Sequence, residues 1–284
     1  MGAVKQGDGD MQKSWFCLIL STGNAINTHL KEKMSNEVQN RPLARQVALV
    51  TGAGRRIGRE IALGLGRAGA TVVVNYNESW DEAQATVHEI KACGVDAVAL
   101  QADVGRPAQV RRMFHKVGRK FGQLDLLVNN AAIFFPVKWD HLTEQHWDRI
   151  LSVNLKGPFF CAQEAAKLMQ RRNCGQIINI SSIGGLQAWP QYMHYCSSKA
   201  GLIMLTRCLA KALAPDIRVN SIAPGTILFP GEKRSPMTKS VIRSTPLRKA
   251  GCAEDIARMV LHLACHGDFI TGQIFPVDGG KSIP

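Results

Sequence analysis

Three side chains in the second half of the chain have the chemistry and the spacing needed to move a proton. In the stretch YMHYCSSK, Tyr195 and Lys199 stand four residues apart, which places them on one face of a helix, one above the other. Ser182 lies where the preceding apolar run ends, so a strand end and a helix can bring all three side chains to one point. A neighbouring positive charge favours the phenolate, so we expect Lys199 to lower the pKa of Tyr195 and prepare it as a general acid and base. The serine hydroxyl is expected to orient a substrate oxygen.

A glycine-rich turn, VTGAGRRIGRE at residues 50–60, follows a short apolar run and opens a helix. In that context the unpaired N–H groups of the helix start and the positive end of its dipole attract a pyrophosphate. Gly52 permits the tight turn after the strand, and Gly58 allows the helix to lie close to the sheet. The turn therefore predicts a dinucleotide-binding loop.

The elements that must position these residues alternate along the chain. Uniformly apolar runs predict strands at 46–51, 71–76, 97–104, 124–131, 175–182, 217–225 and 273–280. Amphipathic helices are expected between them, including one from Thr143 to Arg172 and one from Tyr192 to Leu213. Strands of this kind form parallel sheets that are covered on both faces. The sequence thus predicts an α/β fold, a single doubly wound Rossmann-type domain with a seven-stranded, mostly parallel sheet and helices on both faces.

The chain divides near residue 44. Residues 1–44 are polar and lack sustained periodicity around the short apolar stretch WFCLIL, so we interpret them as a flexible N-terminal extension. That stretch has no clear small-residue cleavage site, which disfavours a signal peptide. Met34 is an alternative start, because the fold-like pattern begins only after it. The folded domain is expected at 45–284.

The formal charge of +13 raises the question of a nucleic-acid partner. The basic residues are scattered along helix-like segments such as QVRRMFHKVGRK, however, and no zinc finger, aromatic-basic RNA motif or basic zipper accompanies them. We interpret these segments as solvated helix faces and expect no nucleic-acid partner. Because no long apolar run is present, we also expect no membrane span.

The cysteine and histidine pattern bears on location and metals. Eight cysteines are irregularly spaced without a C-x-x-C pair, which favours reduced thiols and a cytoplasmic location. His262, Cys265 and His266 share a helical face, but no further ligand is suggested nearby. We interpret them as polar side chains at a helix end and expect no metal.

Together these motifs resemble the short-chain dehydrogenase/reductase family over residues 45–284. TGAGRRIG, ADV, NNA, NLKGPF, ISS, YCSSK, VNSIAPG and TGQIFPVDGG occur in the family's order. The resemblance implies that Tyr195 is the acid and base and that Ser182 holds the carbonyl. Lys199 would bind the nicotinamide ribose and lower the pKa of Tyr195, and Asn154 would hold a water in the proton relay.

The same resemblance implies a set of cofactor residues, a small-molecule substrate and a homotetramer. Asp103 is expected against the adenine and Asn129 along the ribose. The full cofactor set is Gly52, Arg55, Arg56, Ile57, Gly58, Asn75, Asp103, Val104, Asn129, Ala131, Tyr195, Lys199, Pro224, Gly225 and Ile227.

The choice of cofactor is indicated by two positions. Arg55 matches a basic residue of relatives that use NADP. Asn75 stands where users of NAD have an acid that would repel a 2′-phosphate. Both features favour NADPH/NADP+, whereas Glu78 opposes them, because some NADP users have arginine there.

Arg56 replaces the usual glycine of the turn and resembles the pteridine reductase branch, whose turn reads T-G-x-x-x-R-x-G. Its planar guanidinium can clamp a pyrophosphate and a polar heterocycle. Phe134 in NNAAIFFP resembles that branch's aromatic ring, which lies against a pterin. The resemblance thus implies NADPH-dependent reduction of a pterin-like substrate, with Arg56, Phe134, Ser182 and Tyr195 as substrate residues.

Ser182 favours a different substrate. Pteridine reductases of protozoa have aspartate there, whereas 3-oxoacyl-carrier-protein reductases and generic ketone reductases have serine, so a carbonyl substrate stays open beside the pterin. A nucleotide-sensing Rossmann protein is the non-enzymatic alternative, and the intact spacing of Tyr195 and Lys199 argues against it. Residues 229–251 match the segment where the family has a mobile substrate lid.

Overall fold

The computed structural model describes residues 41–232 and 235–283. Residues from Leu43 onward form one compact unit. Leu43 is buried, and its N–H donates to the carbonyl oxygen of Ala68 at 2.9 Å, so the unit is anchored at its first residue. The expected N-terminal extension, residues 1–44, falls almost entirely outside the described residues.

The apolar runs pair into a seven-stranded sheet with the order β3-β2-β1-β4-β5-β6-β7. Its strands are β1 (Val47–Val50), β2 (Thr71–Tyr76), β3 (Ala97–Gln101), β4 (Leu126–Asn129), β5 (Gly175–Ile180), β6 (Ile217–Pro224) and β7 (Ile274–Val277). Every neighbouring pair runs parallel, so the predicted doubly wound sheet is confirmed. Strands are added on one side of β1 up to β3 and on the other side from β4, and such a reversal opens a crevice at the carboxyl end of β1.

Several strands end earlier than predicted. The expected strand 97–104 stops at Gln101. Beyond it the N–H of Asp103 donates to the side chain of Gln109 (2.8 Å) and not to a neighbouring strand. Ser182, expected as the last residue of a strand, lies beyond β5 and caps the short helical turn η4 (Ile183–Gly185). Apolar composition does not show where the hydrogen bonds between strands stop. The predicted strand ends are therefore wrong for residues at the carboxyl edge of the sheet.

Helices fill the intervals between the strands. They are α2 (Arg56–Arg67), α3 (Trp80–Ala92), α4 (Pro107–Phe121), α5 (Glu144–Leu151), α6 (Gly157–Met169), α7 (Met193–Leu213), α8 (Pro236–Arg243) and α9 (Ala253–His266). Short turns are η1 (Trp139–His141), the π-helical η2 (Ser152–Lys156), η3 (Gln170–Arg172), η4 and η5 (Pro190–Tyr192). The predicted helix from Thr143 to Arg172 is therefore α5, η2, α6 and η3 in succession. In the two described ranges, none of the helices is both long enough and apolar enough to cross a bilayer.

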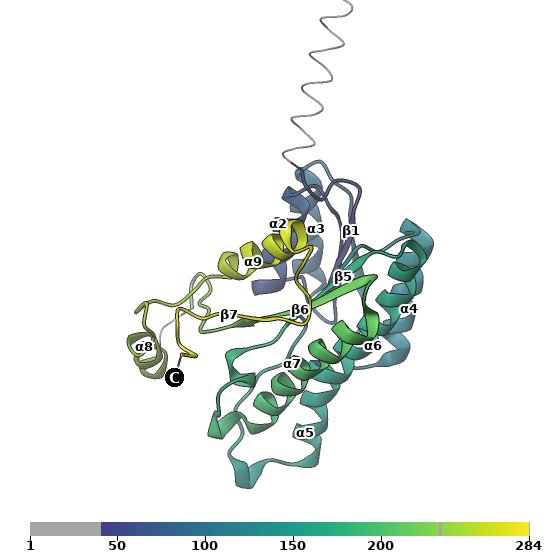
Figure 1. The fold of residues 1–284 in the computed structure, drawn as a ribbon. Coiled ribbons are helices and arrows are strands. Elements are labelled where there is room, and N and C mark those ends of the chain that lie inside the picture. Colours follow the sequence, from purple (N-terminus) through teal and green to yellow (C-terminus); the bar gives the residue numbers. More distant parts are fainter. Residues whose placement is uncertain (1–40, 233–234, 284) are drawn as a thin grey trace, which may run out of the picture. The chain divides into compact units, whose positions relative to one another are not determined.

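The helices form a layer on each face of the sheet, as Figure 1 shows. One core cluster joins the sheet to α2, α3 and α9, and a second joins it to α4, α6 and α7. Alternate strand residues supply the two clusters: Val50 belongs to the first and Leu49 to the second, and both are fully buried. This explains why the strands are apolar throughout, because each residue of a central parallel strand meets one helical layer or the other.

The segment after β6 leaves the sheet and returns to it. The N–H of Leu228 donates to the carbonyl of Gly251 at 3.0 Å, and the N–H of Gly251 donates to Thr226 at 3.0 Å. These bonds close the base of an excursion that contains α8. Its position matches the segment 229–251 expected as a lid, and it includes a helix that the sequence analysis did not anticipate.

Candidate active site

The turn between β1 and α2 forms a cradle at the carboxyl end of β1. A Cβ atom at Gly58 would lie 2.3 Å from the Gly52 carbonyl oxygen and 2.4 Å from Nδ2 of Asn130, so only glycine allows this approach. No side chain caps the N-terminus of α2, and no acid occupies its first turn. Its backbone N–H groups and the positive end of its dipole are therefore available to an anionic group.

Asn130 supports the turn, and the sequence analysis missed it. Its Nδ2 donates to the carbonyls of Thr51 (2.9 Å) and Gly52 (3.1 Å), and its N–H donates to Oγ1 of Thr51 (2.9 Å). Asn129, the expected ribose contact, is 3% exposed and donates to Oδ1 of Asn179 (2.9 Å) and the carbonyl of Pro158 (3.3 Å). Because successive residues face opposite sides of a sheet, Asn129 points toward α6 and away from the turn. The expected contact therefore does not fit the placement of Asn129.

Asn75 also differs from expectation. It is 1% exposed, its Oδ1 accepts the N–H of Gly52 (3.2 Å), and its Nδ2 donates to the carbonyl of Ala102 (3.1 Å). The buried Asn75 side chain thus stabilises the β1–α2 turn. The side chains able to distinguish a ribose with a 2′-phosphate from one without it are therefore exposed neighbours such as Arg55 and Glu78.

The other expected cofactor residues follow the carboxyl ends of strands. These are Asp103 and Val104 after β3, Ala131 after β4, and Pro224, Gly225 and Ile227 at or beyond the end of β6, with Ile57 in the first turn of α2. Parallel strands have their carboxyl ends at one edge, so these positions border one crevice. Asp103 is held there, because its Oδ1 accepts the N–H of Gly105 (2.9 Å) and its Oδ2 lies 3.3 Å from Nε of Arg106. Val104 is buried, which leaves its backbone as the group able to meet a ligand.

Helix α7 carries Tyr195 and Lys199 to the carboxyl end of β5, where Ser182 lies. Lys199 is 2% exposed; its Nζ donates to the carbonyl of Ile180 at 2.8 Å and lies 5.8 Å from the centroid of the Tyr195 ring. The side chain of Ser182 interacts with that of Tyr195, and its Oγ accepts the N–H of Gly184 at 3.0 Å. The structure therefore brings the three side chains together around one phenol.

Burial moves the proton affinities of Tyr195 and Lys199 in opposite directions. It raises the pKa of Tyr195 to about 12, although the hydrogen bond with Ser182 acts to lower it. It lowers the pKa of Lys199 to about 7. The expected lowering of the phenol pKa below its ordinary value is not seen, because desolvation dominates the shift and only the interaction with Ser182 opposes it. Tyr195 is consequently a neutral phenol near pH 7, which is the form able to donate a proton.

Asn154 occupies the π-helical turn η2, a feature that often occurs at functional sites. Its Oδ1 accepts the N–H of Ile133 (2.9 Å), and its Nδ2 donates to the carbonyl of the same residue (3.0 Å) and to Oγ of Ser198 (3.3 Å). Both donor positions are therefore used within the protein. Any relay water would have to bond the remaining acceptor position of Oδ1.

Arg56 and Phe134, expected on one ligand, have separate surroundings. Arg56 has a φ of 55°, its guanidinium lies 3.2 Å from Oε1 of Glu232, and it stacks over the Phe229 ring at 5.0 Å. Phe134 is stacked on Tyr192 with centroids 4.5 Å apart. Among the contacts of the described residues, the two side chains share no partner.

Two aromatic residues near Tyr195, Trp189 and Tyr192, were not among the expected site residues. Trp189 lies nearly parallel to the Tyr195 ring with centroids 6.3 Å apart, and Phe134 meets that ring edge-on at 4.7 Å. Tyr192 contacts both Trp189 and Phe134. The sequence WPQYMHY does contain a local signal, since Tyr192 and Tyr195 are three residues apart and share a helical face.

The three side chains considered as metal ligands, His262, Cys265 and His266, lie on α9. His262 and His266 have ring centroids 5.8 Å apart. Burial raises the pKa of the Cys265 thiol, which disfavours the thiolate that a metal requires. Within the described ranges, no three or more histidine, cysteine or acidic side chains gather as a possible metal site.

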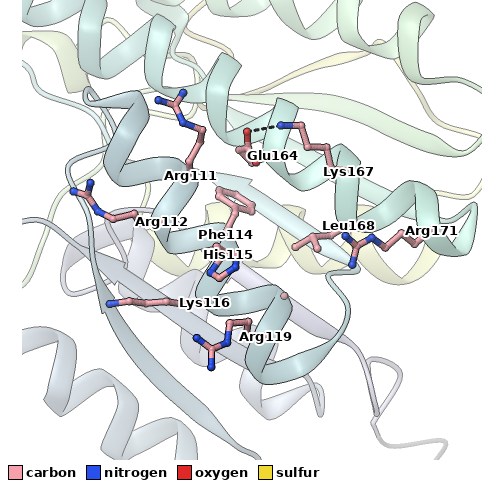
Figure 2. A pocket seen from close by; sticks show the side chains of 11 residues that line it. Arg111, Arg112, Phe114, His115, Lys116, Arg119, Glu164, Lys167, Leu168 and Arg171 are labelled. Carbon is pink, nitrogen blue, oxygen red and sulfur yellow. Dashed lines mark hydrogen bonds and ion pairs between the residues drawn. The ribbon is translucent and has the colours of Figure 1, made fainter.

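A separate groove of about 790 Å³ lies between α4 and α6, away from the residues above (Figure 2). It is lined by Arg111, Arg112, Phe114, His115, Lys116, Gly118, Arg119, Glu164, Lys167, Leu168 and Arg171. In α4 the charged members are exposed, whereas Phe114 is buried under them, so the basic segment is an amphipathic helix with a solvated face, as predicted. Glu164 is paired with Lys167 at 2.7 Å.

Comparison of the sequence with known proteins identifies its family. A family model described as Enoyl-(Acyl carrier protein) reductase matches residues 52–282. The chain is 43% identical over 237 residues to 3-oxoacyl-[acyl-carrier-protein] reductase FabG of Staphylococcus aureus, covering 82% of this chain and 96% of that protein. It is 38% identical over 253 residues to a short-chain type dehydrogenase/reductase of Picea abies, covering 84% and 93%.

Solved structures agree with the fold. A short-chain dehydrogenase from Burkholderia cenocepacia in complex with NADP has a TM-score of 0.80 at 35% identity, covering 85% of this chain and 99% of that one. A short-chain dehydrogenase/reductase from Serratia marcescens has a TM-score of 0.81 at 32% identity with the same coverage. The likeness extends over almost the whole of both structures.

Proposed function

Because the chain belongs to the short-chain dehydrogenase/reductase family, we propose that it reduces a ketone carbonyl to an alcohol with NADPH, using Tyr195 as the proton donor. The observation that carries the proposal is that Ser182 and the buried Lys199 both lie next to the Tyr195 side chain. A neutral phenol beside a second hydroxyl can protonate an oxygen that gains negative charge.

The residues of the β1–α2 turn fit a dinucleotide. The uncapped start of α2, the close approach at Gly58 and the absence of an acid in the first turn suit a pyrophosphate. NADPH, when bound, supplies the hydride for the carbonyl carbon. The Burkholderia relative in complex with NADP supports this choice of cofactor, as does the exposed Arg55 at the start of α2.

Each polar side chain then has a distinct task. Ser182 donates a hydrogen bond that holds the substrate oxygen, and Tyr195 gives that oxygen its phenolic proton. Lys199, buried behind the phenol, restores the proton or stabilises the phenolate that is left. Asn154 holds the backbone of Ile133 and so positions the loop that follows β4.

A pterin-like substrate is the second candidate. It is favoured by Phe134, whose side chain stays half exposed next to Tyr195. Against it, Arg56 is engaged by Glu232 and Phe229, and relatives at 43% identity are named 3-oxoacyl reductases. Ser182 also suits a carbonyl oxygen, so we place the ketone first.

The substrate class can be tested by steady-state assays with NADPH and product analysis. We expect 2,3-butanedione and an acetoacetyl thioester to be reduced to alcohols, and dihydrobiopterin to be reduced more slowly. Turnover of dihydrobiopterin alone would replace the ketone by the second candidate. Absence of product from all three would contradict both.

Arg55→Ala is expected to raise the KM for NADPH about tenfold or more and to leave the KM for NADH nearly unchanged, since a charge-assisted hydrogen bond to phosphate is lost. Arg59→Ala is a matched control on the same helix, because Arg59 is already paired with Glu60 (2.7 Å) and Glu89 (2.6 Å). Equal changes for both cofactors in Arg55→Ala would assign Arg55 to some other task.

Two further expectations stay part of the proposal. A homotetramer is supported by Phe159 on α6 and Met204 on α7, which are apolar and exposed on the helices that the family uses for assembly. A lid at 229–251 is supported by the two backbone hydrogen bonds at Gly251 that close the base of the excursion.

A further inference from the structure

Tyr195 lies within a cluster of four aromatic rings, which we call the aromatic rim: Phe134, Trp189, Tyr192 and Tyr195. Phe134 and Tyr192 are stacked with an interplanar angle of 1°, and Trp189 lies 6.3 Å from Tyr195 at 9°. The two pairs meet edge-on, with Phe134 against Tyr195 at 4.7 Å and Trp189 against Tyr192 at 6.1 Å. The proton donor proposed above is therefore bordered by flat apolar surfaces on more than one side.

The aromatic rim is not part of the hydrophobic core. None of its four members belongs to either core cluster of the described residues. Phe134 keeps 54% of its surface exposed in spite of its stacking partner, and Leu186 and Met193, from the segments that flank Trp189 and Tyr192, are 47% and 43% exposed. Apolar side chains left open around a polar reactive group are the usual composition of a small-molecule pocket.

The rings are also held in fixed positions. The paired hydrogen bonds from Asn154 fix the backbone of Ile133, next to Phe134. The N–H of Val137 donates to the carbonyl of Gln191 at 2.9 Å and ties the Phe134 loop to the segment that carries Tyr192. Trp189 lies against Gly184, where a Cβ atom would come within 2.8 Å of the indole ring. An aromatic surface that is rigid before binding selects for shape, because a ligand that fits it does not have to order it.

Resting on the ketone reduction proposed above, we propose that the aromatic rim selects ketones that carry an aromatic ring next to the carbonyl, in preference to linear 3-oxoacyl chains. One face of Phe134 is covered by Tyr192, and its exposed part offers a flat surface beside the Tyr195 ring. An aromatic substituent can stack or meet edge-on with that surface, whereas a flexible alkyl chain gains only area burial and loses more conformational freedom.

The test uses two esters that differ only in the group beside the ketone, ethyl benzoylacetate with phenyl and ethyl 3-oxohexanoate with propyl. With NADPH and the wild-type protein, we expect kcat/KM for the phenyl ester to be higher by about tenfold, in the range of an aromatic contact. Phe134→Leu and Trp189→Leu, which keep apolar bulk but remove a ring, should each bring the ratio toward one. Phe269→Leu is the matched control, because Phe269 is fully exposed after α9 and lies outside the aromatic rim; it should keep the wild-type ratio.

The outcomes separate this inference from the proposed function. An equal or higher kcat/KM for the propyl ester in the wild type overturns the selection by the aromatic rim and leaves ketone reduction intact. A ratio that survives both rim substitutions also overturns it. Reduction of neither ester by the wild-type protein contradicts the ketone reductase itself. The wild-type ratio decides the matter even where a rim variant does not fold, and thermal unfolding identifies such a variant.

Discussion

Tyr195→Phe is expected to lower kcat for ketone reduction by about 10³-fold, within the 10²–10⁴-fold range of general acid catalysis. The substitution removes one oxygen and keeps the ring, so the contacts with Phe134 and Trp189 are retained. The pKa of about 12 keeps the wild-type phenol protonated at neutral pH, so its proton is present to be donated. The Kd for NADPH should change by less than about threefold, because we expect the dinucleotide to be held mainly at the β1–α2 turn.

This result is checked by single-turnover reduction and by NADPH binding on the same preparation. A thermal melt within error of the wild type excludes misfolding as the cause of lost activity. If Tyr195→Phe retained wild-type kcat, another group or solvent would be the proton donor. The mechanism built on Ser182, Tyr195 and Lys199 would then have to be abandoned.

Lys199→Met should lower kcat by about 10²-fold or more, since the phenol loses the buried group that restores its proton. Methionine keeps the apolar stem, so the loss can be assigned to the amine. The carbonyl of Ile180 loses the 2.8 Å hydrogen bond from Nζ, and this part of the effect will be seen as a change in stability. A KM that rises with kcat unchanged would assign Lys199 to binding alone.

The same variant should change how stability depends on pH. The pKa of Lys199 is lowered from its ordinary value of 10.5 to about 7 in the folded protein. Between these values the unfolded chain binds a proton that the folded chain does not, so the contribution of Lys199 to the free energy of unfolding rises with pH. Below pH 7 both states are protonated and the contribution is constant and unfavourable. We subtract the free energy of unfolding of Lys199→Met from that of the wild type, both measured by denaturant unfolding from pH 6 to 10. This value should become more positive with pH above 7, by up to about 1.4 kcal/mol per pH unit. A flat difference would show that Lys199 is not desolvated as described.

Local patterns in the sequence predicted the framework of the site well. Continuous apolar runs gave the strands because each faces two helical layers, and the four-residue spacing placed Tyr195 and Lys199 on one face of α7. The position of Ser182 after an apolar run was enough to bring it to the same point. Each of these inferences depends on neighbours within a few residues, where periodicity is informative.

The prediction was less accurate where one residue of register decides the direction of a side chain. Asn129 and Asn130 are adjacent, yet one points toward α6 and the other supports the turn. Asn75 was expected among the cofactor residues, in place of an acid that would repel a 2′-phosphate, and it lies beneath the turn, where it accepts the N–H of Gly52. A motif gives the positions of polar residues but not the strand face on which each side chain lies.

Contacts between distant segments could not be predicted at all. Arg56 meets Glu232, 176 positions away, and so is engaged by the segment after β6. The aromatic rim combines Phe134 with residues from 189 onward. Burial also reversed the expected pKa shift of Tyr195, because desolvation depends on the packing of the whole site.

In the proposed reaction, hydride from the cofactor and a proton from Tyr195 reduce a ketone. The most direct test of this reaction is to incubate the protein with ethyl benzoylacetate and NADPH deuterated at both C4 positions, and to examine the alcohol by NMR and mass spectrometry. We expect one deuterium at the carbinol carbon in the wild-type product and no detectable alcohol with Tyr195→Phe in the same time. An alcohol without deuterium, or cofactor oxidation without alcohol, would contradict it.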